Sequence, residues 1–184
     1  MNTIGKNAIR EAIIFAALKH DGQKRKGTDV PYITHPMEVM QILTENKCSE
    51  TVIIAGILHD ALEDTKTCPD EILKLFGEDV LKTVAAETED KTKAWKERKQ
   101  NAIDSLPNAS YEAKLVCCAD KLSNLRSMAA DLITVGNNLW ERFNAGKNDI
   151  GWYYRGVAKA LSGLVDYAMY QELNLLCSQV FGGG

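Results

Sequence analysis

The sequence is poor in the residues that mark secreted, fibrous or disordered chains. Only 4 prolines and 13 glycines occur in 184 residues, which excludes collagen-like and low-complexity chains. The 5 cysteines are odd in number and show no CxxC spacing, so both a disulfide framework and a thiolate zinc site are disfavoured. These shortages indicate a globular, reduced, intracellular chain.

Long apolar runs and excess positive charge are also missing. The longest apolar stretch, 52–58, is too short to span a bilayer, and the N-terminus lacks the apolar core of a signal peptide. With 22 basic and 25 acidic residues the net charge is −3, so no bulk basic field attracts nucleic acid. We therefore expect a cytoplasmic protein that binds neither membrane nor nucleic acid. A local basic patch for a phosphorylated small molecule remains possible on this composition.

The hydrophobic pattern predicts one all-α domain over 1–181, a single compact helical bundle, followed by a flexible glycine tail at 182–184. Apolar residues spaced by three and four predict a helix over 4–20, and the glycine-rich basic segment 22–32 predicts a loop. The charged segment 87–99 is expected to be a solvated surface. Further helices are predicted from their start signals: caps at Thr34, Ser49 (a helix to 65) and Ser110, Pro69 in a first turn, and one last long helix over 150–180.

The segment HDALED at 59–64 closes a helix that is otherwise apolar nearly all round. His59 and Glu63 are four residues apart, as are Asp60 and Asp64, so each pair is expected to share a helix face. Charge inside a buried helix needs a compensating partner, and a divalent cation would supply it. The alternative is a capping aspartate beside a core histidine.

Asp120 lies on an apolar stripe of the helix predicted after Ser110. Three apolar residues precede it by seven, four and three positions and so share its face: Ala113, Val116 and Cys117. Asn124 follows four residues later on the same stripe. An aspartate rarely points into a core without a partner, although by itself such a residue is more often at the helix surface.

Two imidazoles and two carboxylates from three segments are thus candidate metal ligands: His35, His59, Asp60 and Asp120. Taken alone, His35 would be interpreted as a loop or capping histidine, and His20 as a structural one. Mixed nitrogen and oxygen ligands suit a divalent transition metal better than calcium or magnesium. Manganese or iron is favoured over zinc or cobalt.

The order His, His-Asp, Asp resembles that of the HD-domain metal-dependent phosphohydrolases. Four segments resemble the hydrolase domain of RelA/SpoT-type alarmone enzymes: HDGQKRKGTDVPYITHP at 20–36, AGILHDALEDT at 55–65, FGEDV at 76–80 and ADKLSNLRSM at 119–128. The resemblance covers about 8–130, and the chain ends soon afterwards. The chain therefore resembles a stand-alone small alarmone hydrolase, and this resemblance implies the HD-domain helical fold.

This resemblance implies manganese-dependent removal of pyrophosphate from the 3′ position of guanosine tetraphosphate or pentaphosphate, leaving GDP or GTP. It implies that the four candidate ligands above hold the metal and that Glu63 and Asp64 handle the attacking water. It also implies substrate-binding residues: Arg25 against guanine, Lys26 near the phosphates, Asn124 at the ribose or 3′ phosphate, and Tyr153 near the nucleotide. One departure is Lys121 and Ser123, where many long members have Arg and His.

Three alternatives remain open. The same metal site could serve another nucleotide, such as the 2′-phosphate of NADPH or a nucleoside monophosphate. A non-catalytic module could bind the alarmone without cleaving it. Glu63 and Asp64 argue against this alternative, because a module that only binds does not need to activate water. The chain could also be a purely structural helical module. The oligomeric state is left open by the sequence.

Overall fold

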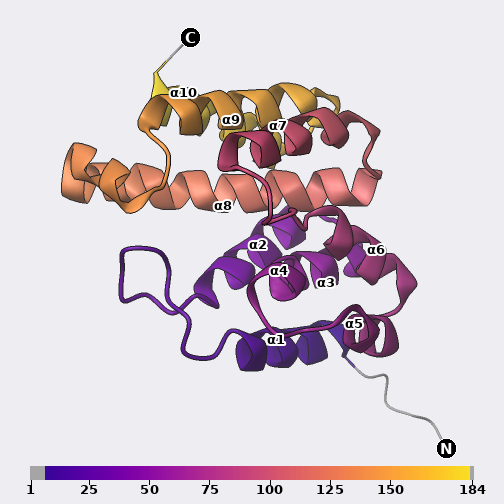
Figure 1. The fold of residues 1–184 in the computed structure, drawn as a ribbon. Helices are drawn as coiled ribbons and strands as arrows, with labels where there is room; N and C mark the ends of the chain where they lie inside the picture. Colours follow the sequence, from indigo (N-terminus) through magenta and orange to yellow (C-terminus); the bar gives the residue numbers. More distant parts are fainter. Residues whose placement is uncertain (1–6, 183–184) are drawn as a thin grey trace, which may run out of the picture. The chain divides into compact units, whose positions relative to one another are not determined.

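The computed structural model describes residues 7–182, and its regular elements there are all helices (Figure 1). The one β-bridge in this part of the chain, Lys24 with Pro31, is isolated. The all-α class is therefore confirmed. Residues 183–184 of the predicted tail and the first residues of the predicted helix 4–20 lie outside the described part.

The chain divides into two compact units, the first ending at Thr88 and the second beginning at Glu89. Each unit is described by itself, and the single domain over 1–181 stays a prediction. No helix within residues 7–182 has both the length and the apolar character needed to cross a membrane.

The first unit is built around α3. Its helices are α1 (Ala8–Lys19), α2 (Thr34–Glu45), α3 (Glu50–Leu58), α4 (Ala61–Asp64), α5 (Pro69–Phe76) and α6 (Glu78–Ala86). Every residue of α3 from Val52 to Leu58 is buried, because α1, α2 and α6 all pack against it (Figure 1). This is the burial expected of a helix that is apolar nearly all round.

Local signals set most helix starts in this unit. Ser49 caps α3 as predicted, with its side chain accepting a hydrogen bond from the Val52 N–H at 3.4 Å. Pro69 begins α5, and Gly77, with φ 90°, separates α5 from α6. The cap predicted at Thr34 is wrong: Thr34 is the first residue of α2, and its hydroxyl donates to the Pro31 carbonyl at 2.8 Å.

The helix predicted to run from Ser49 to residue 65 is also interrupted. It ends at Leu58, and a turn at His59 and Asp60 separates it from α4. The His59 ring turns back to the Gly56 carbonyl at 2.8 Å, and Asp60 departs from regular helix geometry with φ −93° and ψ −3°. The two polar residues thus stand at a break between helices.

The second unit is built on α8. Its elements are α7 (Trp95–Ser105), η1 (Leu106–Asn108), α8 (Tyr111–Val135), η2 (Gly136–Arg142), α9 (Lys147–Ala160), η3 (Ser162–Leu164) and α10 (Ala168–Phe181). Figure 1 shows α7, α9 and α10 gathered along one side of α8. Arg126 on α8 binds both carboxylate oxygens of Glu172 on α10, each at 2.7 Å. Ser110 caps α8 as predicted, accepting from the Ala113 N–H at 3.1 Å.

Two expectations for this unit are wrong. The last helix is not continuous over 150–180, because the chain turns through η3 so that α9 and α10 can pack against each other. The charged segment 87–99 is not all solvated surface, since it includes the start of α7 and its residues Arg98 and Lys99 are half-buried.

Gly56 is a point where α2 and α3 approach closely. A Cβ at this position would lie 2.3 Å from Leu43 Cδ1, and Leu43 is fully buried. Overpacking of this kind costs about 1–3 kcal/mol, and the better helix propensity of alanine returns about 1 kcal/mol.

We therefore expect Gly56→Ala to lower the free energy of unfolding by up to about 2 kcal/mol in urea denaturation. Gly163→Ala is the matched control, because a Cβ there meets no heavy atom within 4 Å. Equal stability of the Gly56 variant and the parent would show that α2 and α3 are less tightly packed than described.

Candidate active site

Two histidines and an aspartate of the first unit converge where α3 ends. His35 is the second residue of α2, while His59 and Asp60 form the turn between α3 and α4. The Nε2 atoms of the two histidines are 3.2 Å apart. Asp60 Oδ2 lies 2.8 Å from His59 Nε2 and 3.7 Å from His35 Nε2. The structure therefore brings together three of the predicted ligands.

The hydrogen bonds of His59 indicate what this cluster can bind. His59 Nδ1 contacts the Gly56 carbonyl, which can only accept, so Nδ1 holds a proton, and in the neutral ring Nε2 presents its lone pair. That lone pair faces the carboxylate oxygen of Asp60. Two acceptors this close repel each other unless positive charge lies between them, and either a second proton on the His59 ring or a divalent metal ion supplies that charge. The nitrogen and oxygen donor set fits such an ion.

Tyr32 supports the carboxylate of this cluster. Its hydroxyl donates a hydrogen bond to Asp60 Oδ2. Its ring contacts the His20 ring, with centroids 4.9 Å apart, and the Arg25 guanidinium, 5.9 Å from the ring centroid. Hydrogen bonds from such outer partners orient metal ligands.

Gln23 connects the loop that holds Tyr32 to the acidic end of the site. Its side-chain oxygen pairs with His20 Nδ1 at 2.7 Å, and its amide nitrogen donates to the Asp64 carbonyl at 2.8 Å. Its own backbone carbonyl accepts from the Tyr32 N–H at 2.9 Å. Sequence analysis singled out neither Gln23 nor Tyr32. The signal available was their spacing, each three residues from a histidine, His20 and His35 respectively.

The predicted acidic pair stands within one helical turn of the ligands. Glu63 is half-buried and Asp64 exposed, both on α4, which starts directly after Asp60. The Asp64 N–H donates to the Asp60 carbonyl at 2.9 Å, which fixes the start of this turn.

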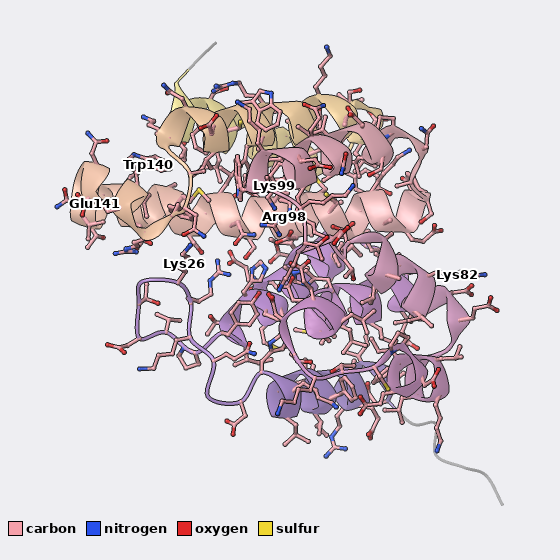
Figure 2. All side chains as sticks on the ribbon, in the orientation of Figure 1. Lys26, Lys82, Arg98, Lys99, Trp140 and Glu141 are labelled. Carbon is pink, nitrogen blue, oxygen red and sulfur yellow. The ribbon has the colours of Figure 1, made fainter. Side chains whose placement is uncertain are left out.

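The predicted basic residues lie on a small hairpin loop between α1 and α2. The Arg25 N–H donates to the Val30 carbonyl at 2.8 Å, and Gly27, with φ 72°, allows the chain to reverse. Lys26 is exposed on this loop (Figure 2), whereas Arg25 lies against Tyr32. The structure thus associates Arg25 with the ligand cluster through Tyr32.

The remaining predicted residues belong to the second unit, so their part in the site stays a prediction. Asp120 is buried on α8, where Asn124 Nδ2 donates to its Oδ1 at 2.6 Å and Lys121 pairs with its Oδ2. This confirms that Asp120 and Asn124 share a helix face. Tyr153 on α9 is 5% exposed, and burial raises the pKa of its hydroxyl above the usual range.

Replacing Tyr32 with Phe removes the hydrogen bond to Asp60 and leaves the ring in place. We expect Mn²⁺ affinity, measured by calorimetric titration, to fall about tenfold because the carboxylate loses its orienting partner. Tyr111→Phe is the control, since its hydroxyl donates at 2.8 Å to Tyr167 and both of these residues belong to the second unit. An unchanged Mn²⁺ affinity in the Tyr32 variant would show that Tyr32 does not orient the Asp60 carboxylate for metal binding.

Comparison with known proteins agrees with the fold. The HD domain family model matches residues 12–151. A protein of Xenopus tropicalis, guanosine-3′,5′-bis(diphosphate) 3′-pyrophosphohydrolase MESH1, is 46% identical over 123 residues, which are 65% of this chain and 69% of that one. The human protein of the same name is 44% identical over 121 residues, covering 64% and 68%.

A solved structure of a metazoan ortholog of SpoT, a protein that hydrolyses ppGpp, shares the fold. It superposes with a TM-score of 0.80 at 30% identity, over 98% of this chain and 99% of that one. The family match covers well over half of the sequence and includes the turn at His59 and Asp60. The chain therefore belongs to the HD domain family.

Proposed function

We propose that this protein hydrolyses guanosine 3′,5′-bis(diphosphate), and the corresponding pentaphosphate, at the 3′ position. The products are pyrophosphate and GDP or GTP. The observation that carries the proposal is the convergence of His35, His59 and Asp60 beside an acidic pair. The relatives named above, with 44–46% identity, are hydrolases of this substrate.

Manganese is the proposed metal, held by His35, His59 and Asp60. Asp120 is proposed as the fourth ligand, on the order of these residues in the sequence and the family to which the chain belongs. A divalent ion in such a site supplies Lewis acidity toward a phosphoryl oxygen and a lowered pKa for water. The cytoplasmic location and the absence of nucleic-acid partners stay predictions.

The chain's own residues have distinct proposed roles. Glu63 and Asp64 orient the attacking water and accept its proton, a task that suits carboxylates close to the reacting group. Arg25 lies against guanine, and Lys26 offsets charge on the phosphates. Asn124 contacts the ribose or the 3′ phosphate, and Tyr153 lies near the nucleotide. Water attacks the phosphorus attached to the 3′ oxygen, so the bond between them breaks and the nucleotide leaves with a 3′ hydroxyl.

Purified protein with Mn²⁺ is expected to convert guanosine tetraphosphate to one GDP and one pyrophosphate, identified by ion-exchange chromatography. In ¹⁸O-labelled water the label should enter pyrophosphate, because water attacks phosphorus. Release of orthophosphate without pyrophosphate would show that the protein cleaves a different bond of the substrate. Turnover confined to NADPH or a nucleoside monophosphate in a parallel panel would overturn the substrate assignment.

Two variants separate metal binding from proton transfer. Asp60→Ala should lose both Mn²⁺ and activity while its circular dichroism stays that of a folded helical protein. Glu63→Gln should keep Mn²⁺ and lower kcat by about 10²- to 10⁴-fold, since it removes a general base. Asp70→Asn, which alters an exposed acid of α5, is the control. Normal turnover by the Asp60 variant would remove that residue from the ligand set.

A further inference from the structure

Three cationic side chains lie close together in the second unit, two of them at the ring of one buried tyrosine. Lys99 on α7 places its Nζ 4.8 Å from the centroid of the Tyr153 ring, and Lys121 on α8 places its Nζ 5.8 Å from it. Arg98 precedes Lys99 on the same helix (Figure 2). Helices α7 and α8 therefore contribute three cations beside Tyr153 of α9, which we call the lysine–arginine cluster: Arg98, Lys99 and Lys121.

Two carboxylates are paired with these three cations. Glu89 binds both Arg98, at 3.2 Å, and Lys99, so one negative charge serves two positive ones. Asp120 pairs with Lys121, and under the proposed function its carboxylate is also a metal ligand. Arg98 Nε is buried and has no hydrogen-bond partner among the described residues. The cluster therefore has three positive charges against two negative ones.

This shortage has a physical cost. The side chains of Lys99 and Lys121 are 19% and 15% exposed, so water screens their repulsion only partly. Burial lowers the pKa of Lys99 and the nearby Lys121 ammonium lowers it further, while Glu89 opposes both effects. An anion with several oxygens would relieve this repulsion and satisfy the unpaired N–H of Arg98, because guanidinium and ammonium groups both bind phosphate oxygens.

We propose that the lysine–arginine cluster binds a diphosphate group, with the Tyr153 ring holding the two lysine side chains in place by cation–π contact. A diphosphate suits three cations better than a singly charged anion, because it offers more charge and more acceptor oxygens. Tyr153 is then a positioning residue that acts through Lys99 and Lys121, consistent with its own burial.

The diphosphate can come from two sources. One is the 5′ diphosphate of the proposed substrate, which stays on the nucleotide while the 3′ diphosphate is cleaved. The other is free pyrophosphate, the leaving group. Identifying either source rests on the proposed function, whereas the binding of a diphosphate by these residues does not.

The test is calorimetric titration of the EDTA-treated full chain with inorganic pyrophosphate, so that binding needs neither metal nor turnover. Lys99→Met should weaken binding about tenfold, the usual effect of losing one charge-assisted contact. Lys99→Arg should retain it. Lys96→Met is the matched control: Lys96 lies on the same helix with its Nζ 5.6 Å from the Trp152 ring centroid, but its side chain is 72% exposed.

Because Lys99→Met leaves Glu89 with one partner fewer, the double variant Lys99→Met/Glu89→Gln should be titrated as well, after thermal melting has shown that it is folded. Weaker binding in both variants supports the site. Binding equal to that of the parent in both, or an equal loss in Lys96→Met, overturns it.

Titration with GDP and guanosine distinguishes the sources. If the cluster holds the 5′ diphosphate, Lys99→Met weakens GDP binding and leaves guanosine binding unchanged. If it holds only free pyrophosphate, GDP binding is unaffected. A protein that binds pyrophosphate through Lys99 but does not hydrolyse guanosine tetraphosphate would overturn the proposed function and leave this site standing.

Discussion

The burial of α3 is the constraint on which the first unit depends. A helix that is apolar nearly all round must be covered on every side, and α1, α2 and α6 cover it. Because α3 ends inside this packing, His59 at its end is buried as well, at 2% exposure. A buried imidazole needs partners for both nitrogens, so the same packing that stabilises the unit also creates a site with oriented donors and acceptors.

The loop between α1 and α2 provides the orientation. Tyr32 of this loop donates a hydrogen bond to Asp60, and Gln23 donates one to the Asp64 carbonyl. A single segment therefore holds both the turn at His59 and Asp60 and the acidic pair that follows it. The same loop carries Arg25, whose guanidinium lies against the Tyr32 ring. Ligand orientation and the position of a basic group are therefore coupled, which suits a site that must hold a cation beside a polyanionic substrate.

The second unit has the opposite local chemistry. Its α8 is buried along much of its length, yet it carries Asp120 and Lys121 side by side in an apolar setting. Lys99 and Tyr153, from α7 and α9, complete a group in which positive charge prevails. The first unit thus gathers acceptors that require a cation, and the second gathers cations that require an anion. A net charge of −3 for the whole chain conceals both.

Sequence alone determined the all-α class and the caps at Ser49 and Ser110, because helix periods and capping depend on neighbouring residues, and it singled out His35, His59 and Asp60 as candidate ligands. Only the tertiary structure decided the break before α4, the turn between α9 and α10, the support of Asp60 by Tyr32, and the approach of Lys99 to Tyr153. Each of these depends on a side chain or helix that is distant in the sequence or turned by packing. Periodicity shows which face of a helix is buried but not which residue that face will meet.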